Sequence, residues 1–192
     1  MIRKMVLASA SPRRKELLNM LGFSDVEIRP AKREEIPPQN ASPAEVVKVL
    51  SAAKAMEVSA NSDPDALVIA ADTIVCLDGC VFGKPRSESD AFQMLRRLSG
   101  RFHEVYTGVT VTDRFGTLCE AERSVVCFRS LTDEEIIRYI ATGEPMDKAG
   151  AYAVQGLGAL FVRSIEGDFF NVMGLPICRL GEMLTKKGVS IL

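Results

Sequence analysis

The sequence has no tryptophan, a single histidine and no long apolar run. Because no stretch of about 18 apolar residues is present, we expect no membrane-spanning helix and no membrane partner. The first residues also lack an apolar run followed by a cleavage site, so we expect no secretory signal peptide. The hydrophobic content of 47% over 192 residues is nevertheless sufficient for a sizeable buried core.

An excess of basic charge is missing as well. The chain has 24 Lys and Arg residues against 25 Asp and Glu residues, which gives a net charge of −1. General nucleic-acid-binding proteins usually carry a strong basic excess, so we predict no nucleic-acid partner. A local anion site remains compatible with this balance. No internal repeat or linker divides the chain, which predicts one domain over residues 1–192.

Cysteine and histidine patterns typical of a metal site are absent. Cys76 and Cys80 lie four residues apart, but no second close pair with histidine follows, which argues against zinc. The five cysteines are odd in number and widely spread, so we expect reduced thiols in a cytoplasmic protein. His103 has no serine or cysteine partner in a nucleophile pattern, and we expect a structural role for it.

The chain does contain helix and strand patterns that alternate along its length. Strands are predicted at residues 4–8, 26–29 and 65–72, the last being apolar and ending in Asp72. Asp78-Gly79 is typical of a hairpin turn. Capping boxes at Ser42–Glu45 and Thr132–Glu135 each predict the start of a helix. Further helices are predicted near residues 12–21 and 87–98 and after Pro176, and alternating antiparallel strands at 103–113 and 121–131. This mixture favours an α/β fold with a mixed sheet.

Two adjacent arginines, Arg13 and Arg14, follow the N-cap residue Ser11 of the predicted helix in "LASASPRRKELL". The helix dipole disfavours cations at this end, so their presence suggests a compensating anion. Free backbone N–H groups point out of the same end, and Ser9 adds a hydroxyl donor. The segment therefore predicts a phosphate-binding site, with a solvent-exposed basic turn as the alternative.

Acidic residues supply the second group of candidates. Asp72 follows the most apolar run of the chain, at the position where α/β sheets usually bind ligands. The alternative for Asp72 is a turn or capping role. Thr73 is next to it and could reach the same ligand. Glu34 and Glu35 lie in a proline-rich loop, and with Asp72 they could provide oxygen ligands for Mg²⁺ or Mn²⁺.

Three further candidates have weaker patterns. Lys54, on the second predicted helix, and Lys84, near the hairpin, are possible cations for an anion site. The segment "GCVFGKP" fails the phosphate-loop pattern, because only three residues separate the glycines and Pro85 follows Lys84. In the glycine-rich segment 143–162, Gln155 offers a donor and an acceptor that suit a base edge. The alternative for this segment is a glycine-rich loop that leads into a strand.

Taken together, six segments resemble the Maf family of nucleoside triphosphate pyrophosphatases, in family order and over nearly the whole chain. They are "LASASPRRKELL" (7–18), "IAADTIV" (69–75), "GKP" (83–85), "GRFHEVYTGV" (100–109), "GEPMDKAGAYAVQG" (143–156) and "GDFFNVMGLP" (167–176). The resemblance implies hydrolysis of a nucleoside triphosphate to monophosphate and pyrophosphate, with a divalent metal cation (Mg²⁺, Mn²⁺ or Co²⁺). It also implies a cytoplasmic homodimer whose fold is an elongated single α/β unit around a mixed sheet, similar to inosine triphosphate pyrophosphatases.

The motif "DKAGAY…QG" looks like that of the subgroup acting on dTTP and UTP, whereas the 7-methyl-GTP subgroup differs at the Lys148 and Gln155 positions. The resemblance implies catalytic and metal-binding roles for Asp72 and Glu35, with Glu34 as the alternative to Glu35. It also implies phosphate binding by Ser9, Arg13, Arg14, Lys54 and Lys84, and substrate choice by Arg13, Thr73 and Gln155. Two rival functions are 7-methyl-GTP hydrolysis and a non-catalytic, nucleotide-binding regulator of cell division.

Overall fold

The computed structural model describes residues 4–33, 36–38 and 40–191. The chain divides into two compact units that alternate along the sequence. The first unit comprises Met1–Asp72, Thr107–Glu122 and Gly174–Leu192, and the second comprises Thr73–Tyr106 and Arg123–Met173. Since neither unit is one continuous segment, a single domain over residues 1–192 stays a prediction.

The first unit is built around short parallel strands. Strand β1 (Met5–Leu7) lies between β2 (Val26–Ile28) and β3 (Leu67–Leu77) and pairs in parallel with both. β5 (Phe102–Asp113) and β6 (Gly116–Phe128) follow in the strand order. The residues of β1 and the first residues of β3 are all buried, as expected for parallel strands covered on both faces.

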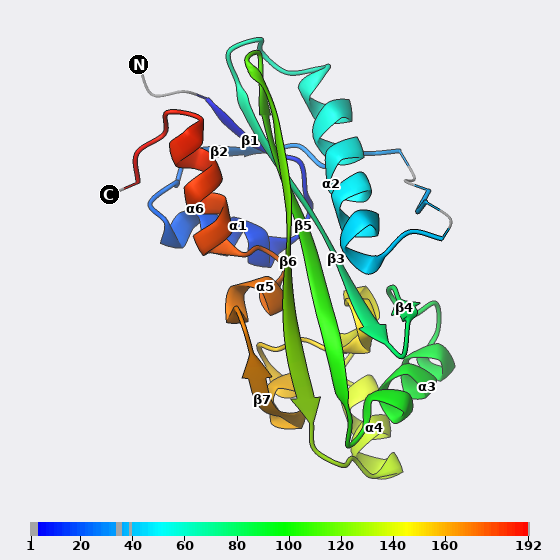
Figure 1. Ribbon diagram of the computed structural model, residues 1–192. Coiled ribbons are helices and arrows are strands. Elements are labelled where there is room, and N and C mark those ends of the chain that lie inside the picture. Colours follow the sequence, from blue (N-terminus) through cyan, green and yellow to red (C-terminus); the bar gives the residue numbers. More distant parts are fainter. Residues whose placement is uncertain (1–3, 34–35, 39, 192) are drawn as a thin grey trace. The chain divides into compact units, whose positions relative to one another are not determined.

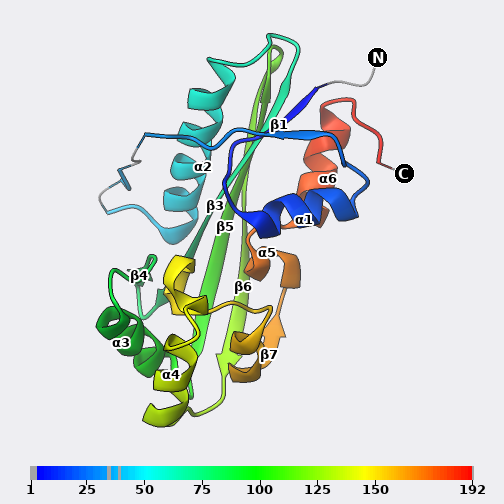
Figure 2. The same ribbon diagram turned by 180° about the vertical axis from the view of Figure 1, so that it is seen from behind.

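Three helices complete the first unit. α1 (Pro12–Met20) and α6 (Ile177–Lys186) lie on one side of its strands and α2 (Pro43–Ser59) on the other (Figures 1 and 2). The predicted capping box starts α2, because Ser42 Oγ accepts the N–H of Glu45 while the Glu45 carboxylate accepts the N–H of Ser42. α2 packs on the sheet through small apolar side chains, which allow a close approach: Val6, Ala8, Ala55, Val58, Val68 and Ala70.

Two contacts hold α2 especially close to β5. A Cβ atom built at Gly108 would overlap the backbone carbonyl of Val47, so only glycine fits there without a shift of the helix. Beside it, Ser51 Oγ lies 2.9 Å from Thr110 Oγ1, and Thr110 Oγ1 lies 3.3 Å from Cys119 Sγ. These contacts fix the segment of α2 that carries the candidate Lys54.

The second unit contains the end of β3, the hairpin strand β4 (Cys80–Phe82), and β7 (Val162–Glu166), which pairs antiparallel with β6. Asp78 and Gly79 both have positive φ, 50° and 76°, and form the predicted turn between β3 and β4. The remaining elements are α3 (Glu88–Leu98), α4 (Asp133–Ile140), α5 (Phe169–Met173) and three short 3₁₀ turns, η1 (Glu144–Asp147), η2 (Ala149–Ala151) and η3 (Leu157–Phe161).

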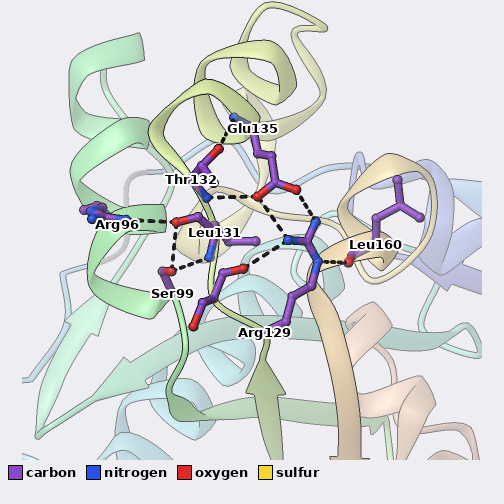
Figure 3. A network of polar contacts seen from close by, with 8 residues as sticks. Arg96, Ser99, Arg129, Leu131, Thr132, Glu135 and Leu160 are labelled. Carbon is purple, nitrogen blue, oxygen red and sulfur yellow. Dashed lines mark hydrogen bonds and ion pairs between the residues drawn. The ribbon is translucent and has the colours of Figure 1, made fainter.

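A polar network fixes the start of α4 (Figure 3). The Arg129 guanidinium donates to both carboxylate oxygens of Glu135, at 3.0 and 2.7 Å, and to the carbonyl of Leu160 at 2.9 Å. The bonds from Arg129 and from the N–H of Thr132 lower the pKa of Glu135 to about 2. Glu135 therefore acts both as the capping-box acid of α4 and as the anchor of the segment that leads into it.

The structure confirms the predicted α/β class with a mixed sheet, and all five cysteines are free thiols. Within the described part of the chain, no helix is both long and apolar enough to span a bilayer. One prediction was wrong: β3 does not end at Asp72 but continues to Leu77. The β-branched run Thr73-Ile74-Val75 favours an extended backbone and carries the strand past the acid.

Candidate functional site

The site is built where β1 ends. The last paired residues are Leu7 and Ile69, after which the N–H of Ala8 donates to the Ile69 carbonyl at 2.8 Å. Ser9 follows, nearly buried, and its Oγ accepts the N–H of Ser11 at 3.2 Å. Asp72 lies three residues beyond Ile69 on β3, so it projects past the carboxyl end of the parallel strands although it is inside a longer strand.

The first turn of α1 faces the same end of the strands. Ser11 is the N-cap residue, but its side chain makes no capping hydrogen bond, and the first turn contains no acidic residue. The positive end of the helix dipole is therefore left without compensation from a helix acid. Arg13 and Arg14 add two positive charges at this end, as the sequence predicted.

Arg14 is oriented by hydrogen bonds to Ser9 and Gly174. Its Nη1 donates to Ser9 Oγ at 3.0 Å, and its Nε donates to the carbonyl oxygen of Gly174 at 2.8 Å. Burial lowers the pKa of Arg14 to about 10, the negative charge of Asp72 opposes this shift, and the positive charge of Arg13 adds to it. Arg14 is therefore protonated at neutral pH, oriented before any ligand arrives, and in the electrostatic field of Asp72.

Asp72 forms an ion pair with Lys54. Lys54 Nζ contacts Asp72 Oδ1, and the two side chains are only 19% and 16% exposed. The pair joins α2 to β3, and it depends on the close packing of α2 against the sheet described above. Removing either partner would leave a largely desolvated charge without its counter-charge, which is strongly unfavourable.

The first unit thus brings together four predicted residues, Ser9, Arg14, Lys54 and Asp72, with Arg13 in the same helical turn. Three predicted residues belong to the second unit. There Thr73 is half-buried on β3, Lys84 is exposed after β4, and Gln155 is exposed before η3. Glu34 and Glu35 lie outside the described residues.

One contact of this site was missing from the sequence analysis. Gly174, in the segment "NVMGLP", supplies a carbonyl oxygen to Arg14 across 160 positions of sequence. A backbone carbonyl exists at every residue, so no residue-type pattern could have found it. His103, by contrast, is buried and its Nε2 lies 2.8 Å from the Tyr152 hydroxyl, which is compatible with the structural role expected for it.

The donor set allows one test of the implied metal. Among the described residues, no group of three or more His, Cys, Asp or Glu side chains could hold a metal ion. Mg²⁺, however, is usually bound by one or two carboxylates together with substrate phosphates. Asp72 fits that mode of binding, in which the metal is shared with the substrate.

Among the described residues, three cations, Arg13, Arg14 and Lys54, and one carboxylate, Asp72, lie at the end of the parallel strands. Such an excess of positive charge at the end of parallel strands is typical of α/β proteins whose ligands are anions. Residues 4–187 match the model of a family described as Maf-like protein. The chain therefore belongs to the Maf-like family.

Relatives cover the whole chain. It is 49% identical over 193 residues to the dTTP/UTP pyrophosphatase of Pelotomaculum thermopropionicum, with 100% of both chains covered. It is 47% identical over 196 residues to the protein of that name from Caldicellulosiruptor bescii, covering 100% of this chain and 98% of the relative. A nucleoside-triphosphatase / dITP/XTP pyrophosphatase structure from Mycobacterium abscessus aligns over 96% of this chain and 98% of its own, with 14% identity and a TM-score of 0.47.

Proposed function

We propose that this protein is a nucleoside triphosphate pyrophosphatase that hydrolyses dTTP and UTP to the monophosphate and pyrophosphate. The observation that carries the proposal is the convergence of Arg14, Lys54 and Asp72 beside the first turn of α1. The family assignment and the names of the full-length relatives support the same activity.

The cations bind and orient the triphosphate. Arg14 is already held in place by Ser9 and Gly174, so it loses little further conformational entropy when a phosphate oxygen arrives. Arg13 and the first-turn N–H groups of α1 add positive potential at the same point. Negative charge grows on the leaving pyrophosphate during the reaction, and such preorganised cations stabilise that charge.

Asp72 activates the attacking water as a general base. The oxygen of the water forms a bond to the α-phosphorus, and the bond from that phosphorus to the oxygen bridging to the β-phosphate breaks. Asp72 accepts the proton that the water releases, while its ion pair with Lys54 keeps the carboxylate oriented. A divalent cation bound by Asp72 and the substrate phosphates would neutralise phosphate charge and lower the pKa of a bound water. Glu35 would be a second ligand.

The remaining assignments rest on the family resemblance alone. Gln155 would hydrogen-bond the pyrimidine edge, Thr73 and Arg13 would contribute to substrate choice, and Lys84 would bind a phosphate. A site that pairs with a base edge rejects other bases strongly, because a mismatch leaves buried polar groups unpaired. By the same family resemblance we propose that the protein is cytoplasmic and forms a homodimer. Sedimentation velocity would test the homodimer.

A substrate panel tests the activity. The purified protein is incubated with dTTP, UTP, dCTP, dGTP and 7-methyl-GTP, each with Mg²⁺, Mn²⁺ or Co²⁺, and the released phosphate species are identified. We expect pyrophosphate, with dTTP and UTP turned over fastest. Release of orthophosphate would contradict cleavage at the α-phosphorus. Tight binding without turnover would support the non-catalytic regulator.

Asp72→Asn tests the assigned base. The amide keeps the shape of the side chain but cannot accept a proton in the same way, so we expect most turnover to be lost. The protein should still fold but be less stable, because Lys54 loses its counter-charge. The matched control is Asp65→Asn, which changes an exposed acid just before β3. Near wild-type kcat in Asp72→Asn, in a protein with an unchanged circular dichroism spectrum, would exclude the role.

A further inference from the structure

The segment that presents Gln155 is tied down by one acidic residue, Glu144. Glu144 begins η1 and is half-buried in the second unit. Its Oε2 accepts the N–H of Leu157 at 3.1 Å, and its Oε1 accepts the N–H of Gly158 at 3.0 Å. Both N–H groups belong to η3, which starts two residues after Gln155.

Tyr139 connects the same carboxylate to the other side of the segment. Its hydroxyl donates to Glu144 Oε1 at 2.9 Å and accepts the N–H of Ala153 at 3.2 Å. Tyr139 is itself buried, with its ring 4.8 Å from that of Phe161. Together the two side chains hold the backbone on both sides of Gln155, at Ala153 before it and at Leu157 and Gly158 after it.

The glycines show that this geometry leaves no spare room. Gly156, the residue after Gln155, has φ 82° and ψ −150°, a conformation essentially restricted to glycine. A Cβ atom there would lie 2.7 Å from Glu144 Oε2, and one at Gly158 would lie 2.6 Å from the Tyr139 hydroxyl. The backbone thus packs directly against the carboxylate and the phenol that bind it.

Charge adds to these contacts. Burial acts to raise the pKa of Glu144, but the N–H groups of Gly158 and Leu157, the Tyr139 hydroxyl and the charge of Lys148 outweigh it and lower the pKa below its usual value. Glu144 is therefore ionised at neutral pH. In contrast to this fully engaged carboxylate, the Gln155 side chain is exposed.

We propose that Glu144 is a positioning residue for Gln155: its carboxylate holds residues 153–158 in the one conformation that presents the Gln155 amide to the nucleobase. This inference rests on the proposed function, because it assigns to Glu144 the preference for a pyrimidine. Glu144 touches no substrate atom in this role. It acts through the backbone on either side of Gln155.

The test compares Glu144→Ala and Tyr139→Phe with Glu166→Ala, which removes an exposed carboxylate from β7 in the same unit. The ratio of kcat/KM for dTTP to that for dGTP is measured in each variant. We expect the ratio to fall by about tenfold in the first two variants, a typical size for coupling between contacting residues, and to stay unchanged in the control. A folded Glu144→Ala protein that keeps the wild-type ratio would overturn the proposal.

A double substitution separates positioning from a general loss of stability. If Glu144 acts only through Gln155, then adding Glu144→Ala to Gln155→Ala causes no further fall in the ratio. A further fall of the same size as in the wild-type background would overturn the assigned route, because it would show that Glu144 acts without Gln155.

Amide hydrogen exchange tests the contact without reference to activity. Exchange at Leu157 and Gly158 should accelerate in Glu144→Ala and remain slow in Glu166→Ala; unchanged exchange would overturn the proposal. If the wild-type protein hydrolyses no triphosphate at all, the proposed function fails. The exchange data then still show whether Glu144 holds the segment.

Discussion

The first prediction concerns a single residue, Arg14, and its contribution to triphosphate binding. Both Ser9 and Gly174 orient its guanidinium. We expect Arg14→Ala to weaken binding of a non-hydrolysable dTTP analogue by about 1.5–3 kcal/mol, the usual value of a hydrogen bond to a charged group. Lys15→Ala, an exposed cation on the same helix, is the control. If titration calorimetry gave equal losses of binding free energy for the two variants, Arg14 would act only as a general surface charge.

A second prediction for a single residue concerns His103 and the dependence of stability on pH. Burial lowers its pKa to about 4, from 6.5 in an unfolded chain. Between these values the unfolded state binds a proton that the folded state does not, so stability falls as the pH falls through this window. We expect His103 to account for about 2 kcal/mol of the loss in unfolding free energy between pH 7.5 and 5.

Two measurements check this. The loss of unfolding free energy in urea between pH 7.5 and 5 should be smaller in His103→Gln than in the wild-type protein. His103 is the only histidine, so its imidazole proton signals are assigned by inspection, and they should shift only slightly between pH 8 and 5. A midpoint near 6.5 would show that the ring is solvated.

The contact of α2 with β5 is the feature to test at the scale of elements. A side chain at Gly108 would collide with backbone atoms of Val47, which cannot move without the helix. We expect Gly108→Ala to lower the free energy of unfolding by about 1–3 kcal/mol, the usual cost of overpacking. Gly83→Ala is the control, since a Cβ atom there meets nothing within 4 Å and the backbone is not left-handed. Equal thermal stability of the two variants would contradict the packing described here.

The elements themselves were largely predictable because their signals are local. The capping boxes at Ser42 and Thr132 start helices as expected, and Asp78-Gly79 forms the hairpin turn. The end of β3 was not predictable from an acid alone. The pairing of β3 with β1 already ends at Ile69, three residues before Asp72, and the strand continues past the acid because its later residues pair with β4.

For the molecule as a whole, the sequence patterns and the family resemblance together proposed Ser9, Arg14, Lys54 and Asp72 as candidates, and the structure places these four residues together. What they could not identify were contacts made by backbone atoms. The carbonyl of Gly174 and the N–H groups bound by Glu144 carry no residue-type signal, and they depend on which distant segments meet. Such contacts orient the predicted residues and become visible only in three dimensions.

The prediction about Mg²⁺ binding also concerns the whole molecule. Because the described residues include no protein-only cluster of metal ligands, we expect Mg²⁺ to bind weakly to the nucleotide-free protein. Binding should tighten when a non-hydrolysable dTTP analogue is present, and Asp72→Asn should remove the tightening. Calorimetric titration of Mg²⁺ with and without the analogue measures this. Saturable tight binding to the protein alone would refute a metal shared with the substrate.

The alternation of the two units along the chain has a consequence for synthesis on the ribosome. The first unit includes Met1–Asp72 but is completed only by Gly174–Leu192, so its earlier residues wait until the intervening second-unit segments and this last segment have emerged. Until then, Arg14 lacks the carbonyl that Gly174 later supplies. The nascent chain thus acquires its oriented guanidinium only after 160 further positions have been translated, however early that arginine was incorporated.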